Sequence, residues 1–123
     1  GQVQYTYRTA GDFFPGSGRA GEANYCAGDQ GAFWQYKDLL FDDRGANFND
    51  RNYLKLAETL ELDIDEFSAC LDANKYAAQV EQDLADFRAA GASGTPSFLV
   101  NGVLAVGGAD YEGLQAAINA ATP

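Results

Sequence analysis

Apolar residues recur at helical spacing through most of this chain, from about residue 19 to about residue 90. Glycines and polar stretches divide that block into several expected helices. Two short helices are expected within about 19–41, separated at Gly28 and Gly31. A third should follow the polar stretch 42–50, a fourth should begin after Asp63, and a longer one should span about 74–90. The expected inward positions are Ala20, Ala23, Ala27, Phe33, Tyr36, Leu40, Tyr53, Ala57, Leu60, Ile64, Phe67, Leu71, Ala77, Val80, Leu84 and Phe87.

Strand-like patterns flank the helical block on both sides. Residues 2–8 alternate between apolar and polar side chains, which predicts a half-buried strand. Two apolar runs, 97–100 and 103–106, are joined by Asn101-Gly102, the dipeptide typical of a type I′ hairpin. Gly107-Gly108 ends the hairpin, and Asp110 is expected to cap a last helix with an inward stripe of Tyr111, Leu114, Ile118 and Ala121. The predicted order is strand, helical block, hairpin, helix.

The length of the chain, its net charge and its lack of histidine exclude several classes of function. With 123 residues we expect one domain, 1–123. Eight Lys and Arg against eighteen Asp and Glu give a formal charge of -10, which repels phosphate backbones and anionic lipid, so we expect no nucleic-acid or membrane partner. The sequence has no His, which excludes Ser/His/Asp triads and the commonest zinc ligand. No acidic stretch has calcium-loop spacing, and we expect no metal and no cofactor.

Two residue groups allow a structural and a functional interpretation. Cys26 and Cys70 are 44 positions apart, a spacing that fits neither CxxC nor a paired metal motif. By themselves they indicate one disulfide or two buried thiols; a bridge would favour an oxidising compartment. The aromatic residues of the second predicted helix indicate either a binding surface or core packing, and their helical spacing favours the core: Phe33, Trp34, Tyr36 and Phe41.

Three short motifs, in this order, resemble the DsbA-like branch of the thioredoxin superfamily: Cys26-Ala27-Gly28-Asp29-Gln30-Gly31-Ala32-Phe33-Trp34, Phe67-Ser68-Ala69-Cys70-Leu71, and Gly94-Thr95-Pro96-Ser97-Phe98 before the hairpin and helix. The resemblance implies an α/β thioredoxin-like fold of DsbA type with a helical insertion at about 19–90. It also implies a cis Thr95-Pro96 bond, a substrate-binding role for Thr95 and Pro96, and a structural disulfide between Cys26 and Cys70.

One departure from the family decides the functional expectation. The family's first strand and its CxxC helix should precede Gln2, so we interpret the chain as N-terminally truncated, with no catalytic residue. Disulfide exchange needs an activated thiolate and a resolving cysteine. We therefore expect a relative of the disulfide oxidoreductases that is inactive alone, with a protein or peptide substrate and an extracytoplasmic or periplasmic location.

The missing strand suggests an alternative function. In the family's sheet it would lie between the strand at 3–8 and the strand at 97–100, which leaves two unpaired edges. The alternative is thus a non-catalytic binding or assembly module that uses the open edges and the cis-proline groove. Such a module would form a homodimer or exchange strands with another chain.

Overall fold

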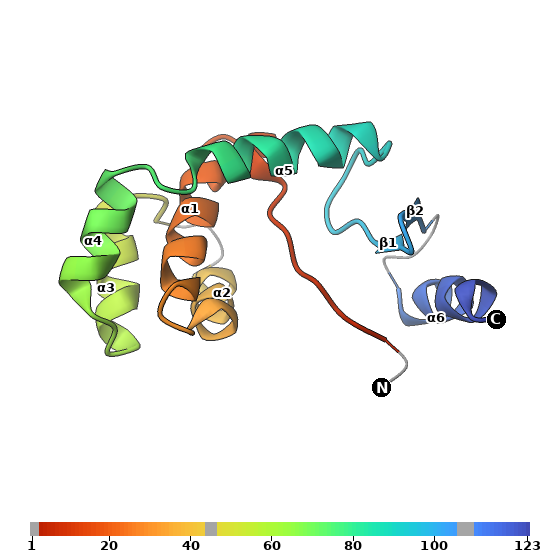
Figure 1. The fold of residues 1–123 in the computed structure, drawn as a ribbon, viewed down its shortest axis with the longest axis horizontal. Helices are drawn as coiled ribbons and strands as arrows, with labels where there is room; N and C mark the ends of the chain where they lie inside the picture. The colour runs from red at the N-terminus through yellow and green to blue at the C-terminus, as the bar shows by residue number, and fades with distance from the viewer. Residues whose placement is uncertain (1–2, 44–46, 106–109) are drawn as a thin grey trace. The chain divides into compact units, whose positions relative to one another are not determined.

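Figure 1 shows the fold in a computed structural model that describes residues 3–43, 47–105 and 110–123. Five α-helices in these residues fill the predicted helical block. Their bounds are α1 Ser17–Gly28, α2 Phe33–Asp42, α3 Asp50–Thr59, α4 Ile64–Asp72 and α5 Ala77–Ala89, and a short 3-10 turn, η1, spans Gly11–Phe13. The predicted break between the first two helices is confirmed, since α1 ends at Gly28 and Gly31 turns the chain at a φ of +76°.

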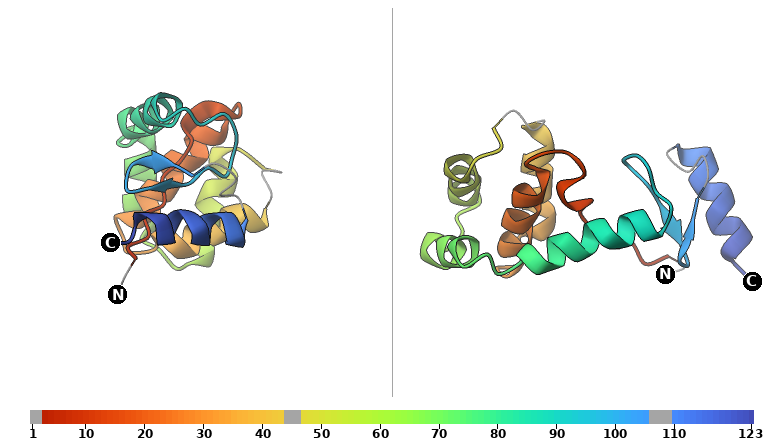
Figure 2. Two further views of the ribbon diagram at one scale, coloured as in Figure 1. Left: turned by 90° about the vertical axis from the view of Figure 1, so that its right-hand side faces the viewer. Right: turned by 90° about the horizontal axis from the view of Figure 1, so that it is seen from above.

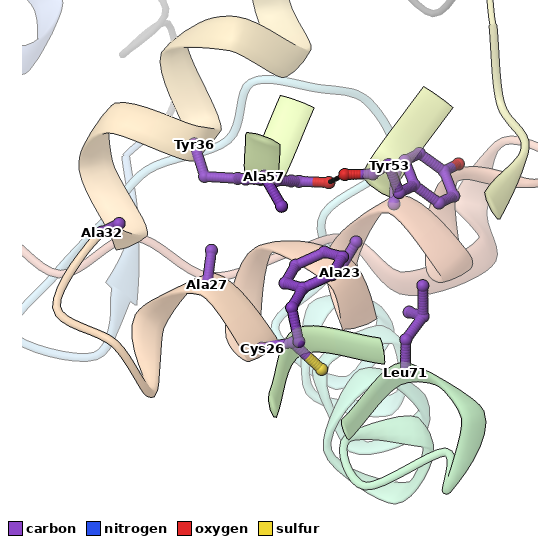
Figure 3. Packing of buried hydrophobic residues seen from close by; sticks show 10 residues of the cluster. Ala23, Cys26, Ala27, Ala32, Tyr36, Tyr53, Ala57 and Leu71 are labelled. Carbon is purple, nitrogen blue, oxygen red and sulfur yellow. Dashed lines mark hydrogen bonds between the residues drawn. The ribbon is translucent and has the colours of Figure 1, made fainter. Parts of the chain in front are cut away.

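The first four helices form a bundle around α1. Helix α1 contacts α2, α3 and α4, while α3 also contacts α2 and α4 (Figures 1 and 2). The core is made of Ala20, Ala23, Cys26, Ala27, Ala32, Tyr36, Tyr53, Ala57, Phe67 and Leu71. Most of its α1 members are alanines, which let the neighbouring helices approach closely. Figure 3 shows Tyr36 and Tyr53 meeting across this core, where the Tyr36 hydroxyl donates to the Tyr53 carbonyl at 2.9 Å.

The helix caps follow the local sequence signals. The Asp63 carboxylate accepts a hydrogen bond from the Glu66 amide at 3.0 Å at the start of α4, and Asn49 does the same for the Asn52 amide in α3 at 2.9 Å. Asp110 accepts from the Gly113 amide at 2.6 Å at the start of the last helix. Each cap satisfies a backbone donor that the helix leaves unpaired. The predicted cap at Asp110 is confirmed, and Asp63 caps the helix that was predicted to follow it.

The contacts divide the chain into two units, residues 1–84 and 85–123. The second unit contains an antiparallel hairpin, β1 Leu99–Val100 and β2 Val103–Leu104, and helix α6, Tyr111–Ala121, which contacts β1. Asn101 and Gly102 have φ values of 51° and 83°, the left-handed pair that a type I′ turn requires, so the predicted hairpin is confirmed. Its predicted continuation through Val106 and Gly107-Gly108 lies outside the described residues.

Helix α6 differs from the prediction at two inward positions. Tyr111 is 80% exposed and Ala121 is exposed as well, whereas Leu114 and Ile118 are half-buried. The described residues of 85–123 contain no buried hydrophobic side chain, because a two-stranded hairpin and one helix offer too little surface to enclose a core. This unit therefore presents an apolar face that is only partly covered.

The predicted strand at 2–8 is wrong for the residues that the structure describes, 3–8. They are extended but belong to no sheet, and Val3 and Tyr5 are 59% and 61% exposed. The alternation that predicted the strand is real, but a strand also needs a neighbour to satisfy its backbone groups. Here the segment is held by its side chains instead.

Candidate functional site

The Thr95-Pro96 loop lies between the end of α5 and the start of β1. Both residues are exposed, and the peptide bond between them is cis. The Ser97 hydroxyl donates to the Gly94 carbonyl and so closes the loop around the proline. The loop therefore presents an exposed stretch of backbone directly before a β-strand.

The outer edge of β1 has no strand beside it in the described residues, because the sheet consists of β1 and β2 alone. Leu99 lies opposite Leu104, between the pairs Val100–Val103 and Phe98–Ala105, and the Ala105 amide donates to the Phe98 carbonyl at 2.8 Å. In an antiparallel ladder this register turns the N–H and C=O of Leu99 away from β2. The edge thus offers a backbone donor and acceptor beside a side chain that is 52% exposed.

Cys26 and Cys70 form a disulfide that joins α1 to α4. They are the only cysteines in the sequence, so the chain has no free thiol. Cys26 is 1% exposed and lies in the bundle core, while Cys70 is partly buried at its edge. In this state the chain has no sulfur nucleophile for disulfide exchange.

The extended segment 3–8 is attached to α2 through aromatic rings. Tyr5 stacks on Trp34 with ring centroids 5.6 Å apart, and Tyr7 meets Phe33 edge-on at 5.9 Å. The Lys37 ammonium lies 5.4 Å from the Tyr7 centroid, and also sits over the rings of Trp34 and Phe41. Burial raises the pKa of Tyr7, with a further contribution from Tyr5.

The predicted core role of the α2 aromatics is therefore only partly correct. Tyr36 is buried, whereas Trp34 and Phe41 are 44% and 61% exposed. All three fit helical spacing, but Trp34 and Phe41 lie on the side of α2 that meets the extended segment rather than α1. The result is an exposed aromatic surface around Lys37.

A buried carboxylate, Asp83 of α5, anchors the other end of this segment. Asp83 is 2% exposed. Its Oδ1 accepts from Arg8 Nε at 2.9 Å, Arg8 Nη2 at 2.6 Å and Gln79 Nε2 at 2.8 Å. Its Oδ2 accepts from Thr9 Oγ1 at 2.9 Å and from the Tyr25 hydroxyl. One side chain thus joins the segment, α1 and α5.

The hydrogen bonds determine the protonation of this cluster. Burial alone would raise the pKa of Asp83, but the bonds from Tyr25, Arg8, Gln79 and Thr9 outweigh it and hold that pKa below its usual value. The pKa of Tyr25 is raised, first by burial and then by its bond to Asp83. Asp83 is therefore ionised at neutral pH and acts as a structural acceptor.

A family model described as thioredoxin matches residues 1–120 of the chain. The chain belongs to the thioredoxin family. The predominance of helix, with a small two-stranded sheet after a proline loop, is consistent with a thioredoxin-like fold. No solved structure matches the chain.

Three curated relatives are named as Na(+)/H(+) antiporters. The chain is 36% identical over 121 residues to the Na(+)/H(+) antiporter NhaA 1 of Salinispora arenicola, an alignment that covers 97% of this chain and 18% of the relative. The identity and coverage are the same for NhaA 3 of Salinispora tropica, and NhaA of Herminiimonas arsenicoxydans is 36% identical over 101 residues, 82% of this chain and 16% of the relative. This chain thus spans less than a fifth of the length of these relatives. In the described residues, no helix is long and apolar enough to cross a membrane.

The structure brings together some of the predicted site residues. Cys26 and Cys70 form the bridge that the family resemblance implied, and Thr95 and Pro96 lie in an exposed loop. Asp83 was missed by the sequence analysis. A signal for it exists, because Asp83 falls three residues after Val80 and immediately before Leu84 on the predicted apolar stripe. An acidic residue at such a position indicates a buried and fully hydrogen-bonded carboxylate.

Proposed function

We propose that this chain is the polypeptide-binding part of a DsbA-like thiol-disulfide exchange domain, and that it does not exchange disulfides by itself. The observation that carries this proposal is the use of both cysteines in one bridge between helices, in a chain of the thioredoxin family. The dithiol for exchange would then come from another segment or another protein. Thr95 and Pro96 are the residues proposed to position the bound polypeptide.

The open edge of β1 supports this binding role. An extended polypeptide can add to a sheet edge through main-chain hydrogen bonds, with apolar pockets selecting its side chains. Leu99 supplies the outward N–H and C=O in the strand that follows the proline loop, and its exposed side chain gives an apolar contact. The expected substrate is an unfolded or extended segment of a protein.

The first experiment measures turnover and binding separately. In an insulin reduction assay the chain should give no rate above that of the dithiol reductant alone, because both of its cysteines are paired in the Cys26–Cys70 bridge and it has no other thiol to form the mixed disulfide. The same preparation should still raise the fluorescence anisotropy of a labelled, carboxymethylated insulin B chain. A rate equal to that of an intact DsbA-like enzyme, run in parallel, would contradict the proposed inactivity.

A second candidate function is assembly, favoured by the same unpaired edge. If two copies join through β1, the protein should sediment as a dimer at micromolar concentration and Leu99→Pro as a monomer, because proline removes the outward donor. Val103→Lys is the matched control, since Val103 is 69% exposed on β2 and its change leaves the β1 edge intact. A wild-type protein that is monomeric at this concentration would exclude the assembly.

We propose an extracytoplasmic or periplasmic location. The disulfide supports it, because such bridges persist in oxidising compartments and are rare in the cytosol. The NhaA relatives suggest that such a domain works beside a membrane transporter. Two free thiols in protein isolated from its native cells without reductant would contradict the location.

A further inference from the structure

The two sulfurs of the Cys26–Cys70 bridge have different surroundings. Cys26 is 1% exposed and belongs to the buried cluster that also contains alanines of α1 and Phe67 and Leu71 of α4. Cys70 is only partly buried and lies next to a group of three polar side chains, of which two are charged and exposed. An incoming thiol can therefore approach the bridge on the Cys70 side.

Asp29, Lys75 and Tyr76 form that group. The Asp29 Oδ2 atom lies 3.8 Å from Cys70 Sγ, and the Lys75 ammonium donates to the same oxygen at 2.7 Å. The Tyr76 hydroxyl donates to the other carboxylate oxygen. Asp29 follows α1 directly, and the Lys75 amide donates to the Cys70 carbonyl at 3.2 Å, so both chain segments are fixed next to the sulfur.

This ion pair keeps the carboxylate charged. Burial works to raise the pKa of Asp29, but its hydrogen bonds from Lys75 and Tyr76 lower that pKa below its usual value. Asp29 is thus ionised beside Cys70 Sγ at neutral pH, with its charge partly offset by the Lys75 ammonium. The carboxylate oxygen is the charged atom placed against the sulfur, and its contribution repels an approaching thiolate, which is itself an anion.

We propose that Cys70 Sγ is the one entry point for external thiols, forming a mixed disulfide there, and that the Asp29 carboxylate selects those thiols by charge. In the step, a small-molecule thiolate attacks Cys70 Sγ and forms a new S–S bond as the old one breaks. The electron pair passes to Cys26 Sγ, which takes up a proton from solvent. A second small-molecule thiolate then attacks the sulfur that the first small molecule contributed to the mixed disulfide. This step releases the reagent as its own disulfide and leaves Cys70 as a thiolate.

Burial of Cys26 Sγ, the leaving sulfur, makes the opening of the bridge slow and restricts the attack to Cys70 Sγ. The Cys26 thiolate would form in the apolar core, where an anion is poorly solvated. The bond therefore breaks slowly, because its leaving group is a poorly solvated anion. Attack at Cys26 is blocked, because its side chain is enclosed by the bundle.

The test compares three thiols whose thiolate forms differ in net charge: glutathione at -2, 2-mercaptoethanol at -1 and cysteamine at zero. The bridge of wild type and Asp29→Asn is opened with each, and rate constants are expressed per thiolate. We expect Asp29→Asn to raise the rate with 2-mercaptoethanol about fivefold, which corresponds to about 1 kcal/mol between unit charges at about 4 Å in water. The effect should be larger for glutathione and close to none for cysteamine.

Two control variants distinguish an effect of the Asp29 charge on the thiol rates from an effect of a loosened fold. Asp65→Asn makes the same charge change on an exposed residue of α4 and should leave all three rates unchanged. Tyr76→Phe removes a hydrogen bond to Asp29 but leaves the Asp29 carboxylate charged. This variant should therefore not alter the order of the three thiols by rate constant. Equal acceleration of the three thiols by Asp29→Asn would overturn the charge selection.

The entry point is tested in the wild-type protein. The reaction with 2-mercaptoethanol is quenched with acid, free thiols are blocked with a maleimide in denaturant, and the peptides are identified by mass. We expect the 2-mercaptoethanol adduct on Cys70 and the maleimide on Cys26. An adduct on Cys26, or equal amounts on both residues, would overturn the proposal.

Discussion

Replacing Asp83 with alanine is expected to lower the free energy of unfolding by about 1.5 to 3 kcal/mol, the range for hydrogen bonds to a charged group. The carboxylate is buried, whereas the Arg8 side chain is 45% exposed and stays solvated, so the loss comes mainly from the broken hydrogen bonds of Arg8, Tyr25, Thr9 and Gln79. Segment 3–8 should lose its anchor at the same time. Urea unfolding followed by far-ultraviolet circular dichroism measures the loss.

In the wild-type protein, acid should remove the contribution that the ionised Asp83 carboxylate makes to the free energy of unfolding. Because the pKa of Asp83 is lowered in the folded state, its stabilisation is fully present above the unfolded pKa of about 3.9 and is lost as the pH falls through the folded value. The stability difference between wild type and Asp83→Asn should therefore shrink below pH 4. Glu81→Gln, an exposed change on the same helix, should cost under about 0.5 kcal/mol. A loss below 1 kcal/mol in Asp83→Ala would mean that the cluster does not anchor the fold.

The sequence predicts the helical part of the fold well because its signals are local. Helical spacing placed residues such as Ala23, Tyr53 and Phe67 in the core, where all are fully buried. The Asp63 cap and the Asn101-Gly102 turn also act over a few residues, so each specifies its own backbone conformation.

The first strand could not be predicted in the same way, because a strand is defined by its neighbour. The alternation in 3–8 is equally suited to a strand and to an extended segment whose tyrosines pack on a helix. Trp34 and Phe41 illustrate the same limit, since their spacing indicates one face of α2 but not which element covers it.

The candidate site was predicted only where the family resemblance covers it. Thr95, Pro96 and the bridged cysteines came from motifs of the DsbA-like branch. Asp83 and Asp29 depend on partners 41 to 75 positions away in the chain, as in the bonds from Arg8 and the contact with Cys70. No short-range pattern encodes such pairings, although an acid on an apolar stripe remains a usable signal.

Removing the disulfide should cost at least as much stability as removing Asp83, by a different mechanism. The bridge closes a loop of 44 positions that includes α2 and α3, and the chain-entropy model gives about 4 kcal/mol for a loop of that size. The double variant Cys26→Ala/Cys70→Ala removes the bridge without leaving a free thiol. Urea unfolding of this variant and of the wild type measures the loss of stability. The denatured chain of the variant is less restricted and exposes more surface, so the slope of the free energy against urea should rise. In Asp83→Ala the slope should stay constant while the midpoint falls. An unchanged slope with a loss below 1 kcal/mol would mean that bundle packing, rather than the bridge, holds α1 to α4.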